Sequence, residues 1–222
     1  MNGELNLMSV TTILTDLSDV LIGGIIGLDD AISNKYGESF GNEFSIRFAS
    51  TYSAFNDLMR GRISEEEYWE CLYLDGLWGD ILSIADMRDL FTLNMKKTIP
   101  GTLDLYSRLI LPNGCSPKYY IVSDHIKEYR EHITNWHRDI FNLIDKAYWS
   151  YDCGRIKRDD DFFTIFFQDN SISSNDVIFI DDSRQNIDNA NRSNILSIHF
   201  SSSETLKEDL LKLGFSFTSK AP

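Results

Sequence analysis

The chain has 222 residues, and its contents of 42% hydrophobic and 25% charged residues are those of an ordinary globular protein. Its formal net charge of −13 disfavours nucleic-acid binding, which needs a basic surface, and repels phosphorylated ligands at long range. No apolar run is long enough for a transmembrane helix, and residues 1–10 lack the basic and apolar parts of a secretory signal. We therefore expect a cytoplasmic protein that does not bind membranes.

The first predicted element is a buried strand over residues 10–15, which leads into Asp16. Gly23 and Gly24 then indicate a turn, and the pattern from about residue 28 to residue 94 is mostly helical. Ser64 and the three glutamates after it form a capping box, so a helix is expected to begin there.

After residue 94 predicted strands alternate with predicted helices. The strands are expected at about 118–123, 146–151, 177–180 and 195–200, and the helices at about 100–109, 127–137, 160–167, 185–191 and 204–213. This alternation is typical of a parallel sheet with right-handed crossovers. The predicted fold class is therefore α/β, with a Rossmann-like parallel sheet.

Polar residues stand where three of these strands end. Asp16 follows the first strand, Ser123 ends the second, and Asp181 and Asp182 follow the strand at 177–180. Parallel sheets bind ligands at the carboxyl ends of their strands, so these side chains are expected to meet in one crevice. Asp16 there suits a nucleophile or a metal ligand, although one such aspartate can equally be a turn or cap residue.

The adjacent Asp181 and Asp182 concentrate negative charge at one strand end. Mg²⁺ prefers one or two carboxylates together with water and phosphate, so this pair predicts a magnesium site. Acids also favour the N-terminal end of a helix, and the pair can cap the next helix as well.

Ser123 and the backbone N–H groups after it can hold a phosphate oxygen, or Ser123 can be a plain N-cap. Asp124 is expected beside the substrate, and His125 is expected to be a partly exposed residue at the start of a helix.

Lys157 lies just before a predicted helix and can neutralise both a nucleophile and a phosphoryl group. Arg155 and Arg158 compete with it for this role, and all three can instead belong to a solvated basic loop.

Four segments together resemble the haloacid dehalogenase superfamily. Residues 13–21, Ile-Leu-Thr-Asp-Leu-Ser-Asp-Val-Leu, resemble the first motif, and residues 120–123 resemble the second. Lys157 stands at the lysine of the third motif, and residues 177–186 with the later Ala190 resemble the fourth. The order and spacing agree, and the resemblance covers about residues 10–22 and 95–205.

The resemblance implies two domains. Residues 1–22 and 95–222 are expected to form the α/β core domain, and residues 23–94 a small helical cap domain inserted after the first strand. Residues 60–64, Arg-Gly-Arg-Ile-Ser, resemble the cap of the phosphatase-like subgroup.

The resemblance also implies a mechanism, in which Asp16 attacks phosphorus and forms an aspartyl-phosphate. The Ser18 carbonyl and the carboxylates of Asp16 and Asp182 are expected to hold Mg²⁺, with Asp181 supporting the metal. Ser123 and Lys157 are expected to bind the phosphoryl oxygens.

Ser18 departs from the family pattern, because phosphatases of the family usually carry a second, acid/base aspartate at this position. Loss of such a group costs about 10²–10⁴-fold in rate. Asp19 is acidic, but neighbouring side chains of an extended segment point to opposite faces, so Asp19 is expected to face away.

These features predict a Mg²⁺-dependent phosphatase that acts on a small phosphorylated metabolite and that is slowed where Ser18 replaces the acid/base aspartate. The alternative is a catalytically degenerate member that binds a ligand or a protein partner. A 2-haloacid dehalogenase is less favoured, because that chemistry needs no metal and leaves the acidic pair unexplained. The sequence does not define the substrate or the oligomeric state.

Overall fold

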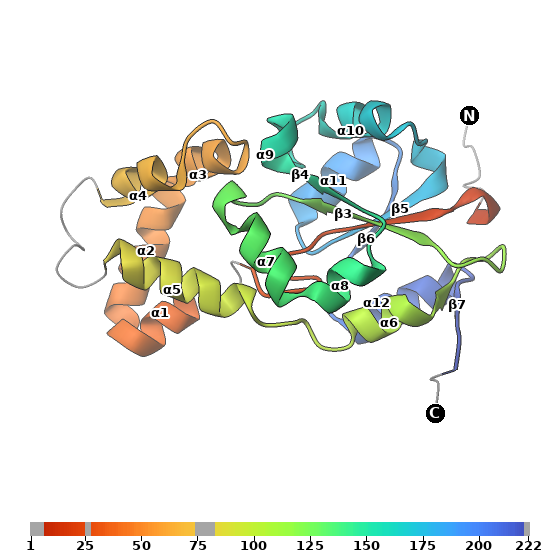
Figure 1. Ribbon diagram of the computed structural model, residues 1–222, viewed down its shortest axis with the longest axis horizontal. Helices are drawn as coiled ribbons and strands as arrows, with labels where there is room; N and C mark the ends of the chain where they lie inside the picture. Colours follow the sequence, from red (N-terminus) through yellow and green to blue (C-terminus); the bar gives the residue numbers. More distant parts are fainter. Residues whose placement is uncertain (1–6, 25–27, 74–82, 220–222) are drawn as a thin grey trace.

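Five parallel strands form the central sheet of the computed structural model, which describes residues 7–24, 28–73 and 83–219 (Figure 1). The strand order is β4-β3-β1-β5-β6, so the first strand lies in the middle. The strands are β1 (Thr12–Thr15), β3 (Lys118–Ser123), β4 (Lys146–Trp149), β5 (Val177–Asp181) and β6 (Leu196–His199). The predicted α/β class with a Rossmann-like parallel sheet is thus confirmed.

The two faces of the sheet bury different sets of side chains. Ile13 packs into one core cluster and its neighbour Leu14 into the other, as the alternation of side chains along a strand requires. The cluster around Leu14 includes Phe163 and Ile187, which belong to α10 (Phe162–Asn170) and α11 (Arg184–Arg192). The opposite face is covered by α6 (Thr102–Arg108), α7 (Arg130–Trp136) and α12 (Ser203–Lys212). Every residue of β1 and β5 is buried, as expected for central strands that are covered on both faces.

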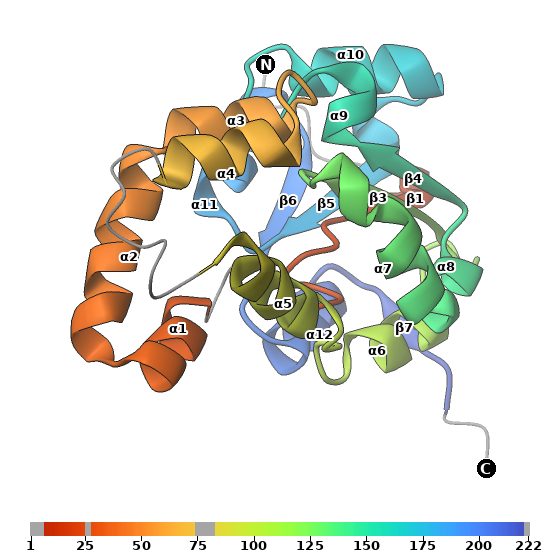
Figure 2. The same cartoon turned by 60° about the vertical axis from the view of Figure 1, so that its left-hand side comes forward.

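A helical region follows β1 and lies beyond the carboxyl ends of the strands (Figures 1 and 2). Its helices are α1 (Leu28–Tyr36), α2 (Glu38–Ser50), α3 (Tyr52–Met59), α4 (Glu65–Tyr73) and α5 (Ile84–Met95). Residues 25–27 and 74–82 of the expected cap lie outside the described part of the chain. The expected capping box is present, because the Ser64 hydroxyl accepts from the Glu67 N–H and the Glu67 carboxylate accepts from the Ser64 N–H.

Several hydrogen bonds join this helical region to the helices and loops that surround the sheet. The Arg60 guanidinium pairs with Asp159, with Nε 3.0 Å from Oδ2. The Ser150 hydroxyl donates to the Met59 carbonyl at 2.6 Å. The Tyr129 hydroxyl donates to the buried Glu65 carboxylate at 2.8 Å. The helices are therefore held directly over the strand ends.

The predicted elements differ from the observed ones at a few places. The strand predicted over 146–151 ends at Trp149, where the chain turns into the short helix α9 (Ser150–Cys153). The helix predicted over 127–137 begins as a 3₁₀ turn at Lys127–Tyr129, and α8 (Arg138–Leu143) follows it without a long loop. The antiparallel pair β2 (Leu109–Ile110) and β7 (Ser216–Phe217) was not predicted, because two-residue strands leave no periodic pattern.

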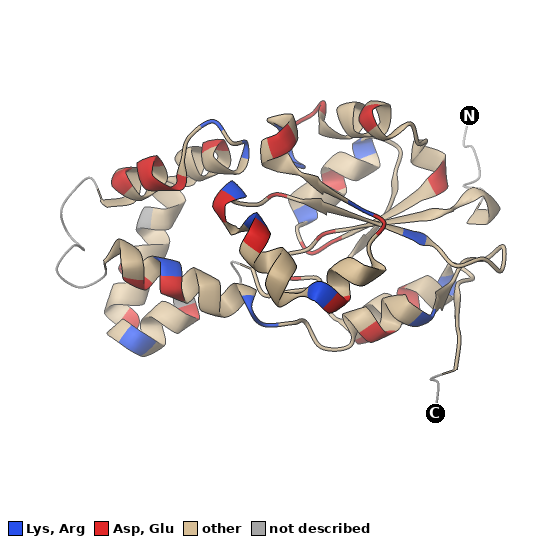
Figure 3. Ribbon diagram, viewed as in Figure 1, with Lys and Arg blue, Asp and Glu red and all other residues tan. Residues whose placement is uncertain are grey.

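Charged residues of both signs are interspersed over the helices of both regions (Figure 3). In the part of the chain that the structure describes, no helix is long and apolar enough to cross a membrane.

Candidate active site

The register of the sheet brings the two acidic strand ends together. Thr15 of β1 lies opposite Ile180 of β5, and the Asp16 N–H donates to the Ile180 carbonyl at 2.8 Å. Asp16 and Asp181 therefore emerge side by side at the same edge, as parallel pairing predicts. Carboxylate oxygens of Asp16, Asp181 and Asp182 all lie within 4.8 Å of one another.

Lys157 bridges two of these carboxylates. Its Nζ lies 2.6 Å from Asp16 Oδ2 and 2.6 Å from Asp181 Oδ2, and its side chain is only 1% exposed. The other oxygen of Asp16, Oδ1, accepts from the Leu17 N–H at 2.7 Å. The Asp16 carboxylate is thus held in one orientation by a backbone donor and a cation.

Asp181 and Asp182 have different surroundings. Asp181 is fully buried, and besides Lys157 it accepts from the Ser183 N–H at 2.8 Å and from Asn186 Nδ2 at 3.0 Å. Asp182 lines the cavity at the strand ends, and its backbone carbonyl lies 2.8 Å from His199 Nε2. Only Asp182 of the pair therefore presents its carboxylate to a ligand.

The positive charge of Lys157 does not balance the negative charge of the three buried or partly buried carboxylates, and their pKa values show this. Burial raises the pKa of Asp16 well above its ordinary value, and Asp181 and Asp182 add to this against the opposing effect of Lys157. Burial and the adjacent Asp181 raise the pKa of Asp182 to about 6. Burial alone would lower the pKa of Lys157, but the carboxylates of Asp16 and Asp181 raise it above its ordinary value.

This imbalance fits a divalent cation. Three carboxylates lie around a single ammonium group, which contacts only two of them. Carboxylate oxygens are ligands that Mg²⁺ prefers. A cation beside Asp16 and Asp182 would favour their ionised forms and so oppose the effect of burial.

The segment that carries Lys157 is fixed from both sides. Both oxygens of Asp124 accept from the Lys157 N–H, at 3.0 and 3.2 Å. Asn189 Nδ2 donates to the carbonyls of Lys157 and Asp159, at 2.7 and 2.9 Å. Asp124 was expected beside the substrate; it lines the cavity, but its carboxylate is directed at the backbone of Lys157.

Neither of the two arginines that competed with Lys157 contacts Asp16, although Arg158 lines the same cavity. Arg155 pairs with Asp161 on the surface, Nε to Oδ1 2.9 Å. The Arg158 guanidinium donates to the Tyr52 hydroxyl and lies over the Tyr52 ring, 4.9 Å from its centroid. Only Lys157 of the three contacts Asp16.

Ser123 is buried at the end of β3, and its hydroxyl has no hydrogen-bond partner among the residues that the structure describes. A buried hydroxyl without a partner is uncommon in proteins and indicates a missing acceptor or donor.

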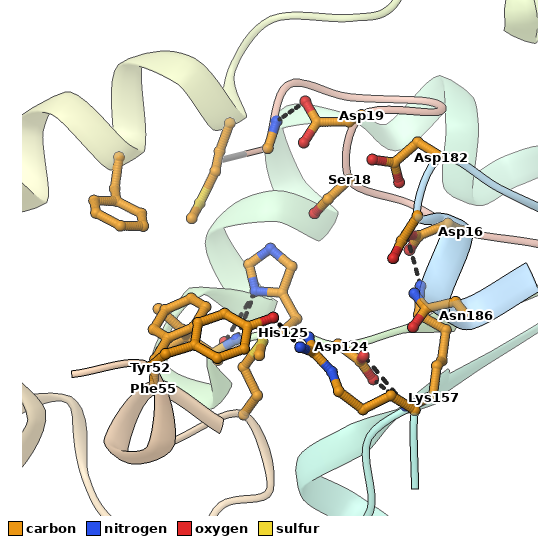
Figure 4. A pocket seen from close by; sticks show the side chains of 17 residues that line it. Asp16, Ser18, Asp19, Tyr52, Phe55, Asp124, His125, Lys157, Asp182 and Asn186 are labelled. Atoms are coloured by element: carbon orange, nitrogen blue, oxygen red, sulfur yellow. Dashed lines mark hydrogen bonds and ion pairs between the residues drawn. The ribbon is translucent and has the colours of Figure 1, made fainter. Parts of the chain in front are cut away.

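Ser18 lines the cavity next to Asp16 and Asp182 (Figure 4).

The expectation that Asp19 faces away from the site is wrong. Asp19 lines the same cavity as Asp16 and lies beside Asp182 and Ser18 (Figure 4). The segment is not extended there, because Asp19 has a left-handed backbone with φ of 59° and its Oδ1 accepts from the Gly24 N–H at 2.9 Å. The strict alternation of an extended strand therefore does not apply.

The expectation that His125 is partly exposed is also wrong. Its side chain is only 4% exposed, and it forms part of the cavity wall between the carboxylates and the helical region (Figure 4). The preceding polar strand end gave no signal of this burial, which comes from the ring of Trp149, whose centroid lies 5.9 Å from that of His125.

The cavity itself has a volume of about 190 Å³. This is smaller than the 300–1,000 Å³ of typical drug-sized ligand sites, so it suits a small molecule. Its wall on the side of the helical region is mainly apolar, with Phe55, Met59, Phe91 and Met95. None of these four was predicted to be a site residue, because buried apolar residues on helices are core residues by default.

Comparisons with known proteins agree with the fold. No family model matches the sequence, and no curated protein sequence matches it either. A predicted HAD-like family hydrolase from Porphyromonas gingivalis is similar in structure, with a TM-score of 0.67 and 20% identity over 92% of this chain and 98% of that one. A HAD-family enzyme from Bacteroides thetaiotaomicron, in complex with magnesium and inorganic phosphate, has a TM-score of 0.63 and 18% identity over 87% and 95% of the two chains.

The L-2-haloacid dehalogenase from Xanthobacter autotrophicus, with chloropropionic acid covalently bound, is similar as well. Its TM-score is 0.61, with 13% identity over 96% of this chain and 85% of that one. The neighbours therefore include both a magnesium and phosphate complex and a dehalogenase. Together with the sheet order and the site at its carboxyl edge, they show that the chain has the haloacid-dehalogenase-like fold that its four motifs predict.

Proposed function

We propose that the chain is a Mg²⁺-dependent phosphatase of the HAD-like hydrolases that acts on a small phosphate monoester. The observation that carries this proposal is the Asp16 carboxylate, fixed by Lys157 and the Leu17 N–H and facing a cavity that Asp182 also lines. A phosphate complex of a structural neighbour supports the same assignment. The helical region α1–α5 serves as the cap in this proposal.

Asp16 acts as the nucleophile. A carboxylate oxygen attacks phosphorus, the bond from phosphorus to the ester oxygen breaks, and the alcohol leaves after it gains a proton. Water then attacks the aspartyl-phosphate, releasing inorganic phosphate and restoring Asp16. Lys157 neutralises charge on the phosphoryl oxygens, and the Ser123 hydroxyl, which is unpaired within the described part of the chain, binds one of them.

Asp16, Asp182 and the Ser18 carbonyl are the groups that would hold Mg²⁺, and the bound ion would supply positive charge to the transferring phosphoryl group. Asp181 does not bind the metal in this assignment, because its oxygens already accept from Lys157, Ser183 and Asn186. It instead fixes Lys157 and the start of α11.

Proton transfer is the weak part of the site. Ser18 stands where the acid/base aspartate is expected, and a serine hydroxyl does not protonate a leaving group at neutral pH. Turnover is therefore expected to be slow with poor leaving groups and faster with a phenolate, which needs no acid.

Phosphate release from p-nitrophenyl phosphate tests the proposal. The wild type should release phosphate only with Mg²⁺, and Asp16→Asn should lower kcat by about 10⁴-fold or more, because the nucleophile is lost. Asp188→Asn, the same change on the exposed face of α11, is the matched control and should retain full activity. Turnover that survives Asp16→Asn, or no turnover of any phosphate ester by folded, Mg²⁺-loaded protein, would overturn the proposal.

Dehalogenation is the second candidate, because a dehalogenase is among the structural neighbours. The acidic groups around Asp16 disfavour it, since an anionic haloacid would enter a site that holds three carboxylates and one ammonium group. Chloride release from 2-chloropropionate without Mg²⁺ would favour dehalogenation over phosphate transfer.

A further inference from the structure

His125 is held in the cavity wall by contacts on three sides. Its backbone N–H donates to the Ser150 hydroxyl oxygen at 3.1 Å, and the Ile126 N–H donates to its ring nitrogen Nδ1 at 2.8 Å. Its ring meets the Trp149 ring edge-on at an interplanar angle of 85°. These contacts fix both the position and the rotation of the imidazole.

The contact with Ile126 also assigns the proton of the ring. A peptide N–H can only donate, so Nδ1 must accept with its lone pair and the proton must lie on Nε2. The Ile126 carbonyl lies farther from Nδ1, at 3.3 Å, so the opposite tautomer would exchange the shorter contact for a longer one. Burial lowers the pKa of the imidazole to about 4, which keeps the ring neutral at physiological pH.

Nε2–H of His125 is therefore a neutral donor in the wall of a small cavity. The structure shows no partner for Nε2 within residues 7–24, 28–73 and 83–219, although the side chain is 96% buried. Because the ring lines the cavity, this donor is available to an acceptor on a bound ligand.

The position of the His125 ring along the cavity determines which part of a bound ligand it can contact. Figure 4 shows the ring between the carboxylate end, with Asp16 and Ser18, and the end formed by Tyr52 and Phe55. A phosphoryl group beside Asp16 and Lys157 leaves the rest of the ester to pass His125 and reach the apolar wall of Phe55, Met59 and Phe91.

We infer that His125 is a specificity-determining residue, whose Nε2–H donates to a carbonyl or hydroxyl oxygen on the leaving group of a small phosphate monoester. The acceptor lies one or two bonds from the ester carbon, and the remainder of the leaving group is apolar. The inference rests on the proposed phosphatase function and adds a substrate class to it.

Two phosphate esters of nearly equal shape test the inference. Acetol phosphate carries a carbonyl oxygen where 2-methylallyl phosphate carries a methylene group. The ratio of their kcat/KM values is measured for the wild type, for His125→Phe, which removes the donor, and for His125→Gln, whose amide NH₂ lies near the position of Nε2. Intrinsic reactivity of the two esters cancels when the ratio is compared between variants.

His125→Phe should lower the preference for acetol phosphate by about 3- to 10-fold, the usual effect of one neutral hydrogen bond. The loss should appear mainly in KM for acetol phosphate, and His125→Gln should restore part of it. His132→Phe, the same change at an exposed residue of α7, should leave the ratio as it is in the wild type. An unchanged ratio in His125→Phe, or no recovery in His125→Gln, would overturn the inference.

A binding measurement separates this inference from the phosphatase proposal. If the wild type hydrolyses neither these two esters nor any other phosphate ester, the proposed function fails, and calorimetry with the same two esters and Mg²⁺ still tests His125. Tighter binding of acetol phosphate that is lost in His125→Phe supports the donor role, and equal binding of both esters refutes it. If His125→Phe does not fold, His125→Asn replaces it, because the shorter amide does not reach the position of Nε2.

Discussion

The two walls of the cavity differ in how they are built. The sheet side presents charged groups that are fixed by several partners, as Asp16 is by Lys157 and the Leu17 N–H. The side of the helical region presents apolar side chains such as Phe55 and Met59, held by packing. In the proposed phosphatase, the groups at the sheet edge would carry out the reaction and the helical region would limit the shape of the leaving group.

Lys157→Met should give the largest effect on the sheet side. Removing the shared ammonium leaves Asp16 and Asp181 buried together without a cation, which is expected to cost about 3–5 kcal/mol of stability in the metal-free protein. Urea unfolding measures this cost, and kcat should fall by about 10³-fold. Lys127→Met, at an exposed position, is the control. A stability loss equal to that of the control would show that Lys157 does not balance the carboxylates.

Ser18→Asp should raise activity, because it restores an acid where the family pattern places one. The expected gain in kcat is about 10²-fold with alkyl phosphates and smaller with p-nitrophenyl phosphate, whose leaving group needs no proton. Comparing the two substrates measures the effect. An equal gain for both would contradict a role in proton transfer, and no gain would indicate that another group supplies the proton.

Mg²⁺ binding should weaken as the pH falls. Burial and Asp181 raise the pKa of Asp182 to about 6, and the metal needs the ionised carboxylate. Below pH 6 the apparent affinity should therefore fall by about tenfold per pH unit for one proton, and it should level off above pH 7. The increase in Tm with added Mg²⁺, followed from pH 5 to pH 8, measures this. A constant increase across this range would exclude Asp182 as a ligand.

The smallest catalytic effect is expected for Tyr129→Phe, which removes a hydrogen bond between the sheet side and the helical region. The lost hydroxyl donates to Glu65, which also accepts from Trp69 and Arg88, so the carboxylate stays paired. We expect a stability loss of about 1.5 kcal/mol and a change in kcat/KM of less than about threefold. Tyr148→Phe, whose hydroxyl donates to Asp169, is the control. A large change in kcat would show that this contact orders the catalytic groups.

The same two walls differ in what the sequence predicts. Asp16, Asp181 and Lys157 were identified because buried parallel strands end in polar residues and the order of motifs locates the lysine. Ser123 was likewise placed at the end of β3, where the structure has it. The aspartates and Ser123 follow from the ends of strands that a periodic pattern reveals, whereas Lys157 lies in a turn and was placed by the order of the motifs alone.

The remaining features depend on tertiary contacts that no local pattern contains. Asp19 enters the cavity because its backbone is left-handed, which alternation along a strand does not anticipate. His125 is buried because Trp149 and Ser150 of a distant segment pack on it. Phe55 and Met59 face the cavity only because of how the helical region sits over the sheet.

The central claim is that Asp16 receives the phosphoryl group, and trapping that intermediate tests it most directly. Enzyme with Mg²⁺ and p-nitrophenyl phosphate is quenched in acid during turnover, digested and analysed by mass spectrometry. One added phosphoryl group is expected on the peptide that contains Asp16, and it should be removable by hydroxylamine and missing in Asp16→Asn. Phosphate release without this label, or a label on another residue, would contradict the account.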